Sequence, residues 1–177
     1  MKRVFLVGYM AVGKTTIGKL LSKELNVEFI DLDKYIVNRY RKTVQEIFAE
    51  KGEDKFRIIE REMLHEVATF QNVLISTGGG TPCFFDNMDV MNRQGVTVYV
   101  KAPVDQLVSR LLNSKNVRPI IHKKSPQELK EFVTEHLALR EKYYSKATLT
   151  YQTGHLGLLS DVNESVVAIK NMLLAND

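Results

Sequence analysis

Short apolar runs alternate with longer amphipathic stretches along the whole chain. Five of the runs have the length and composition of buried strands, and they cover residues 2–7, 27–31, 72–76, 96–100 and 147–151. Between the runs, apolar residues recur every three or four positions, which predicts helices. Strands that alternate with helices predict an α/β fold, in which one parallel sheet has helices on both faces.

The ends of the helical stretches carry recognisable signals. Helices are predicted over 14–25, from about 34 to 70 with breaks, from about 86 to 95, after Pro103, from 125 to 144 and after Asp161. Thr43 and Glu46 have the spacing of a capping box, as do Asp161 and Glu164. Glycine favours the C-terminal end of a helix, so Gly52 and Gly95 are predicted stops.

The first strand runs into the pattern G-x-x-x-x-G-K-T at Gly8–Thr15. Glycines at its two ends allow positive φ and a close approach of phosphate oxygens, while Lys14 suits the β- and γ-phosphates and Thr15 suits Mg²⁺. A chance glycine turn beside a surface lysine is the alternative. The strand before the loop and the helix after it favour a nucleotide site, whose predicted residues are Gly8, Met10, Ala11, Val12, Gly13, Lys14, Thr15 and Thr16.

Composition narrows the class of protein. The 177 residues suit one domain over 1–177 with a mobile flap, and the mixture of 44% hydrophobic and 26% charged residues is ordinary for a soluble protein. No apolar stretch reaches the roughly 20 residues that span a bilayer, so we expect a cytoplasmic protein without a membrane partner. A single cysteine, Cys83, excludes an internal disulfide and a cysteine-cluster metal site.

The net charge of +4 raises the question of nucleic acid. Lysines and arginines are scattered among acidic residues, and the longest basic runs are pairs such as Lys123-Lys124. An enzyme that handles a nucleotide and a second anion would also be basic. We therefore expect no nucleic-acid partner.

Two carboxylates follow the second strand. Asp31 and Asp33 lie on one face if the strand continues, whereas Asp33 could instead cap the next helix, and spacing leaves both interpretations open. A phosphoryl transferase needs one carboxylate near Mg²⁺ and another near the attacking hydroxyl. The third strand ends in Ser76-Thr77, with no acidic residue, so Asp31 is the predicted metal carboxylate, together with Thr15.

The third strand leads into Gly78-Gly79-Gly80. Three glycines offer backbone N–H groups to a small ligand but no acid or base. A plain flexible turn is the alternative.

Taken together, these motifs resemble the shikimate kinase family. The matching segments occur in the family's order over nearly the whole chain: Gly8–Thr15, Asp31–Asp33, Phe56-Arg57 with Glu60, Thr77–Gly80, Arg118-Pro119, and Arg140 with Tyr144 and Ala147. The resemblance implies a three-layer, nucleoside-monophosphate-kinase-like P-loop fold with a five-stranded parallel sheet. It also implies a substrate-binding helical region at about 33–61 and a lid at about 113–124. The implied reaction is transfer of the γ-phosphate of ATP to the 3-hydroxyl of shikimate, in the pathway to chorismate and aromatic amino acids.

The same resemblance implies residue roles. Asp33 would position the 3-hydroxyl, Arg57 and Arg140 would bind the shikimate carboxylate, and Gly79 and Gly80 would approach the substrate through their backbone. Arg118 would close over the phosphates, and Arg110 would stack on adenine. The predicted catalytic residues are Lys14, Asp33 and Arg118.

Other residues stay ambiguous. Without the resemblance each arginine, Arg61 included, would be interpreted as a surface charge, and Phe48 and Phe56 would belong either to the substrate pocket or to the core. No chemistry is assigned to the histidines, His65, His122, His136 and His155. The loop Thr153–Gly157 lacks a proline that some family members carry, which leaves open how adenine is held.

Two rival functions share parts of this pattern. A gluconate or nucleoside-monophosphate kinase would have the same loop and lid, but Asp33 and the triple glycine favour a hydroxyl-rich carboxylate. A nucleotide-binding regulator or GTP switch is the other rival, and the chain has neither an N/T-K-x-D nor a D-x-x-G motif. We expect a monomer whose partners are shikimate, ATP and Mg²⁺.

Overall fold

Five parallel strands form one sheet in the order β2-β3-β1-β4-β5. The structure is a computed structural model that describes residues 3–113, 124–154 and 159–176. The strands in these ranges are β1 (Arg3–Val7), β2 (Glu28–Asp31), β3 (Val73–Ser76), β4 (Val96–Lys101) and β5 (Leu149–Gln152). The predicted α/β class and the five-stranded parallel sheet are confirmed.

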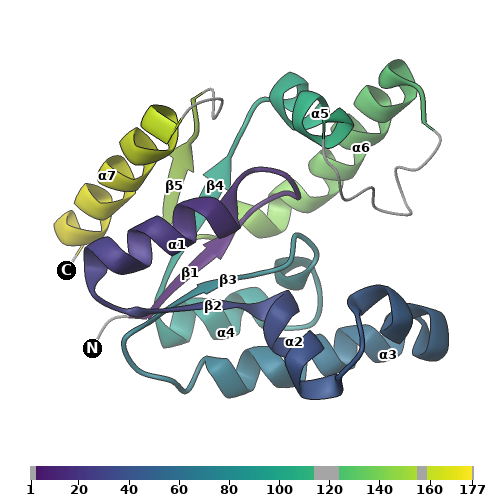
Figure 1. Ribbon diagram of the computed structural model, residues 1–177, viewed down its shortest axis with the longest axis horizontal. Coiled ribbons are helices and arrows are strands. Elements are labelled where there is room, and N and C mark those ends of the chain that lie inside the picture. Colours follow the sequence, from purple (N-terminus) through teal and green to yellow (C-terminus); the bar gives the residue numbers. More distant parts are fainter. Residues whose placement is uncertain (1–2, 114–123, 155–158, 177) are drawn as a thin grey trace.

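Helices connect successive strands and cover the sheet (Figure 1). They are α1 (Lys14–Leu25), α2 (Leu32–Tyr40), α3 (Val44–Val67), α4 (Asn87–Gln94), α5 (Val104–Leu112), α6 (Pro126–Tyr144) and α7 (Leu159–Ala175), with a short 3₁₀ turn η1 (Thr81–Cys83). Figure 1 shows α1 and α7 side by side, and the two helices pack against each other. The central strand β1 is a continuous apolar run, and Phe5, Leu6 and Val7 are fully buried, as expected for a parallel strand covered on both faces.

Most predicted helix ends agree with the structure. The predicted helices over 14–25 and 125–144 are confirmed by α1 and α6. Thr43 forms the predicted capping box with Glu46, and Ser125 forms one with Glu128. Gly52 adopts φ 78 and interrupts the helical backbone inside α3, which confirms the break predicted there.

Two boundaries were predicted wrongly. Helix α7 begins at Leu159, so Asp161 lies inside the first turn and is not the cap. An acidic side chain is favourable anywhere near the N-terminus of a helix, so the motif alone does not fix the first residue. Strand β5 begins at Leu149, two residues after the predicted start at Ala147.

Candidate active site

The site lies where three neighbouring strands end. In the sheet register Asp31 of β2 is opposite Ser76 of β3, and Ser76 is also opposite Leu6 of β1. The phosphate loop, Asp31 and the triple glycine therefore leave the sheet at one level and on one edge. This is the edge at which parallel α/β sheets bind ligands.

The phosphate loop has three residues with positive φ. Gly8 and Gly13 adopt φ 140 and 101, as the pattern predicts, and Ala11 adopts φ 61. A Cβ at Gly8 would lie 2.3 Å from the carbonyl oxygen of Val100, so only glycine fits there. Gly13 precedes α1 and supplies no side-chain cap. The first N–H groups of α1 therefore remain available to an anion.

Lys14 folds back over the loop. Its Nζ donates to the carbonyl oxygens of Gly8 and Tyr9, at 2.7 and 2.9 Å. The side chain is buried, and Lys14 is the first residue of α1. The ammonium group therefore lies at the loop that is predicted to bind the phosphates.

The two predicted metal ligands are in contact. The Thr15 hydroxyl donates to Asp31 Oδ2 at 3.0 Å, while Asp31 Oδ1 accepts from the backbone N–H of Lys34 at 3.2 Å. A hydroxyl and a carboxylate this close fit Mg²⁺, which takes oxygen ligands and is usually bound by one or two protein groups together with phosphates and water. The second bond also makes Asp31 the cap of α2. The capping alternative considered for Asp33 therefore applies to Asp31.

Each glycine of the triple glycine lies beside one of the side chains predicted to bind the acceptor. A Cβ at Gly78 would lie 3.0 Å from Asp33 Oδ1, and a Cβ at Gly79 would lie 3.5 Å from Arg140 Nη1. A Cβ at Gly80 would lie 2.7 Å from Arg57 Nη2. The three predicted acceptor-binding side chains come from α2, α3 and α6, and they meet at this loop. The same loop is close to the phosphate loop, since the Gly79 Cβ would also lie 3.2 Å from the backbone nitrogen of Met10.

We expect Gly80→Ala to weaken acceptor binding selectively. The new methyl group would collide with the guanidinium of Arg57, which its own contacts prevent from moving freely. The KM for the acceptor should rise about 10-fold or more, which corresponds to roughly 1.4 kcal/mol, while the KM for the nucleotide stays within about twofold. Steady-state kinetics with each substrate varied in turn measures both constants, and an equal rise in the two would contradict the expectation.

Arg57 is held by acids and aromatic rings. Its guanidinium pairs with Glu60 at 2.9 Å and with Glu53 at 3.1 Å. Three rings surround it, with centroids 5.8, 5.3 and 4.1 Å from Cζ, and they belong to Phe48, Phe56 and Phe84. A planar guanidinium is suited both to such stacking and to binding a carboxylate through two N–H groups. Phe56 is buried and Phe48 partly so, so these rings belong to the core and also border the site.

Glu60 is the buried acid behind Arg57. It is 1% exposed and also accepts a hydrogen bond from Thr81 Oγ1 at 2.6 Å. Burial raises the pKa of Glu60, while the charge of Arg57 and these hydrogen bonds oppose the rise. A buried acid paired in this way fixes the orientation of its partner, because moving Arg57 would leave the carboxyl group without compensation.

Arg140 lies on α6, near the ring of Tyr9 and one turn before Tyr144. Its Cζ is 5.8 Å from the centre of the Tyr9 ring, and one turn later the Tyr144 hydroxyl donates to the carbonyl oxygen of Gly79 at 2.5 Å. Cys83 is also close enough to be influenced by Arg140, but burial raises the pKa of this thiol to about 11. The thiol therefore stays protonated near neutral pH and is a poor nucleophile.

Arg110 and Thr16 lie at or next to the phosphate loop, whereas Arg61 is a surface residue. Arg110, predicted to stack on adenine, donates to the carbonyl oxygens of Ala11 and Val12 at 3.3 and 3.2 Å. Thr16 is exposed in the first turn of α1. Arg61 pairs with Asp86 at 2.9 Å, and its side chain is 42% exposed, so it belongs to the surface.

Some predictions lie outside the described residues. These are Arg118, lid residues 114–123, His122, and residues 155–157 of the predicted adenine-facing loop.

Similarity to known proteins decides the family. Residues 10–170 match the family described as shikimate kinase. The chain belongs to the shikimate kinase family. It is 53% identical to a shikimate kinase of Parabacteroides distasonis, over 98% of this chain and 100% of that protein.

Two solved structures of shikimate kinases have the same fold. The enzyme of Bacteroides thetaiotaomicron is 47% identical, with a TM-score of 0.94 and 98% of each chain covered. The enzyme of Acinetobacter baumannii, solved in complex with shikimate, is 28% identical, with a TM-score of 0.88, 100% of this chain and 95% of that chain covered. The resemblance noted in the sequence to the shikimate kinase family is thus confirmed.

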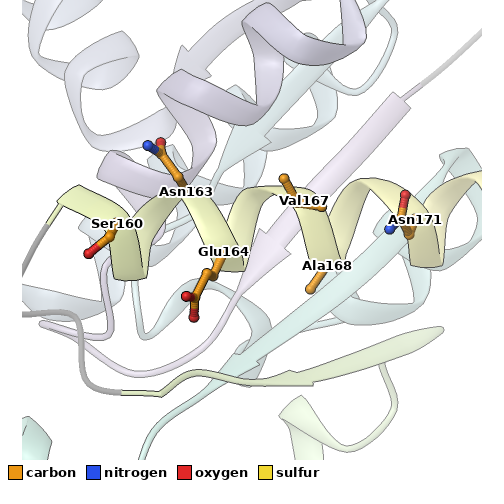
Figure 2. Close-up of a pocket in the computed structure, with 6 residues that line it drawn as sticks. All are labelled: Ser160, Asn163, Glu164, Val167, Ala168 and Asn171. Carbon is orange, nitrogen blue, oxygen red and sulfur yellow. The ribbon is translucent and has the colours of Figure 1, made fainter.

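A separate hollow of about 610 Å³ lies along α7 (Figure 2). Its lining comes from that helix alone and consists of Ser160, Asn163, Glu164, Val167, Ala168 and Asn171. These side chains include one carboxylate and no cation. The hollow therefore lacks the groups that bind a nucleotide or a carboxylate acceptor.

Among the described residues, no helix is both long enough and apolar enough to cross a membrane.

Several contacts of the site have no counterpart in the sequence analysis. Tyr9 and His136 form a hydrogen bond between the phosphate loop and α6, and Phe84 stacks on Arg57. The sequence carries one partial signal, because His136 stands four residues before Arg140 and so shares its face of α6.

Proposed function

We propose that this chain transfers the γ-phosphate of ATP to the 3-hydroxyl of shikimate, and that Asp33, Arg57 and Arg140 hold the acceptor. The observation that supports these roles is the convergence of the three side chains on Gly78-Gly79-Gly80, beside the phosphate loop. An acceptor bound by them would stand next to the phosphates. Such positioning provides much of the catalysis in phosphoryl transfer.

The two arginines bind the acceptor's carboxylate. Arg57 and Arg140 approach the triple glycine from different helices, and their guanidinium groups lie beside adjacent glycines. Two forked cations are suited to a planar carboxylate, and they disfavour acceptors without one. The carboxylate therefore fixes the orientation of the ring, and Asp33 receives the hydroxyl that attacks.

Asp33 orients the attacking hydroxyl. It is half-buried in the first turn of α2, with Oδ1 against Gly78. A carboxylate there accepts a hydrogen bond from the hydroxyl and aligns the oxygen with the terminal phosphate.

The nucleotide side consists of the phosphate loop and its neighbours. Lys14 and the N–H groups at the start of α1 bind the phosphates, and Thr15 and Asp31 hold Mg²⁺ directly or through water. Bound Mg²⁺ neutralises negative charge on the phosphates. The resemblance assigns Arg118 to a lid at about 113–124. There Arg118 would stabilise charge on the transferred group, and the lid would exclude water.

An acceptor panel tests this function. The purified chain is assayed with Mg·ATP and with shikimate, gluconate or AMP as the acceptor, and ADP release is followed by a coupled reaction. Shikimate should give the highest kcat/KM. Turnover of AMP or gluconate with none of shikimate would contradict the proposal, and a folded protein that turns over none of them would favour the non-catalytic regulator.

We also propose the domain extent, the oligomeric state and the location of this chain. The chain acts as one unit over 1–177, as a monomer in the cytoplasm, with ATP and shikimate as its partners. Its substrate-binding helical region corresponds to about 33–61. Light scattering of the purified protein measures the mass, and a stable dimer would contradict the monomer.

A further inference from the structure

Helix α6 presents a row of side chains at four-residue spacing. Phe132, His136, Arg140 and Tyr144 follow one another at this interval, which places them on one face of the helix. The face contacts two loops. His136 contacts the phosphate loop through Tyr9, and Tyr144 contacts the triple glycine through Gly79.

The contact between Tyr9 and His136 joins residues 127 positions apart. The Tyr9 hydroxyl and His136 Nδ1 are 2.9 Å apart, and the two rings meet edge to face with centroids 5.6 Å apart. Tyr9 is 1% exposed, so its ring has little freedom. It belongs to the phosphate loop, where its carbonyl oxygen accepts from Lys14. The position of the Tyr9 side chain is thus tied to that of the loop.

Arg140 lies one turn after His136 and one turn before Tyr144. Its guanidinium rests near the Tyr9 ring and beside Gly79. Helix α6 is therefore attached to the phosphate loop on one side of Arg140 and to the triple glycine on the other. Any shift of the helix along the phosphate loop would carry Arg140 with it.

We propose that the Tyr9–His136 hydrogen bond is a positioning contact that sets the place of Arg140, and so of the acceptor's carboxylate, relative to the phosphate loop. The inference rests on the proposed function, because it takes Arg140 as an acceptor-binding residue. It assigns a positioning role to two residues outside the proposed set of acceptor ligands. It also explains why a tyrosine in the loop is buried against α6.

The surroundings of His136 suit this role. Burial and the neighbouring Arg140 lower the pKa of His136 to about 4, against the opposite influence of Glu53. The ring is therefore neutral near pH 7 and can make the bond to Tyr9 in either tautomer. A neutral ring also adds no second cation beside Arg140. Phe132 also packs against the imidazole, with the two ring centroids 5.0 Å apart.

The test begins with Tyr9→Phe, which removes one oxygen atom and keeps the ring next to Arg140. A single hydrogen bond between neutral groups corresponds to about a 2- to 10-fold change in an equilibrium constant. We expect the KM and the Kd for shikimate to rise about 3- to 10-fold, while the Kd for Mg·ADP stays within about twofold. His136→Leu should have the same effect, and His136→Gln, whose amide can still bond to Tyr9, should restore part of the loss. The double variant Tyr9→Phe with His136→Leu should be no worse than either single variant, because both remove one bond.

Tyr151→Phe is the matched control. It also removes a tyrosine hydroxyl that is bonded to another side chain, Ser165, at 3.1 Å, but it lies on β5, outside the substrate-binding helical region, and takes no part in the proposed site. Its kinetic constants should equal those of the wild type. Thermal unfolding of all variants separates loss of stability from loss of positioning.

The outcomes are distinct. Unchanged shikimate constants in Tyr9→Phe and His136→Leu, or equal losses for both substrates, would overturn the inference alone, provided that the wild type phosphorylates shikimate. A wild type that does not phosphorylate shikimate overturns the proposed function and this inference with it. If Tyr9→Phe does not fold, the comparison of His136→Leu with His136→Gln decides between a positioning role and a purely structural one.

Discussion

Asp33→Asn is expected to lower kcat by about 10³-fold, while Mg·ADP binding stays within about twofold of the wild type. Asparagine has nearly the same shape but lacks the negative charge with which Asp33 is proposed to orient the attacking hydroxyl, and groups that act on a reacting hydroxyl contribute about 10²- to 10⁴-fold. Asp33 lies beside Gly78 of the triple glycine and outside the phosphate loop, so the binding of Mg·ADP should be retained. Single-turnover kinetics with shikimate and titration calorimetry with Mg·ADP measure the two effects.

Asp89→Asn is the matched control for this variant. Asp89 is an exposed acid in the first turn of α4, as Asp33 is an acid in the first turn of α2. Both changes remove a charge that is favourable at a helix N-terminus, but only one removes a group beside the triple glycine. An Asp33→Asn protein as active as Asp89→Asn would refute the assigned role.

Arg57→Lys has the second largest expected effect, a rise of about 30-fold in the KM for shikimate. Lysine keeps the positive charge but cannot donate two parallel N–H groups to a carboxylate, and a hydrogen bond to a charged group is worth about 1.5–3 kcal/mol. Lysine also loses the stacking on Phe84, whose ring centre is 4.1 Å from the Arg57 Cζ. The KM for ATP should be unchanged. Initial rates at saturating ATP, with shikimate varied, give the constant.

Arg61→Lys controls for the change of residue type on the same helix. Arg61 stands four residues after Arg57 in α3, but it pairs with Asp86, and both side chains are exposed by more than two fifths. Its substitution should leave both KM values within about twofold. If the two variants behave alike, Arg57 is not a specific ligand of the acceptor's carboxylate.

The phosphate loop shows what a sequence can predict. A glycine pattern between an apolar run and an amphipathic helix depends on neighbours within a few residues, so strand β1, the loop and helix α1 followed from local sequence. Gly8 and Gly13 took the expected conformations. The positive φ of Ala11 did not follow, because alanine usually avoids that region and the surrounding loop imposes it.

The convergence of the acceptor side chains was only partly predictable. The alternation of strands and helices places the ends of β1, β2 and β3 at one edge, but the order β2-β3-β1-β4-β5 depends on tertiary packing. The triple glycine was ambiguous between a flexible turn and a ligand loop. In the structure Asp33, Arg57 and Arg140 lie beside successive glycines, which favours the ligand loop.

Contacts between distant residues left no pattern in the sequence. His136 was given no chemistry because the histidines lack the spacing of metal ligands, and its partner Tyr9 is 127 residues away. Likewise, Phe84 stacks on Arg57 because the 3₁₀ turn η1 returns the chain toward α3. Pairings of this kind are set by the packing of whole elements and require the three-dimensional structure.

A crystal structure with Mg·ADP and shikimate bound tests the central claim most directly. The account predicts that the shikimate carboxylate lies between Arg57 and Arg140, that its 3-hydroxyl is within hydrogen-bond distance of Asp33, and that its ring rests on Gly79 and Gly80. Shikimate bound elsewhere, or with its carboxylate turned toward Asp33, would contradict it.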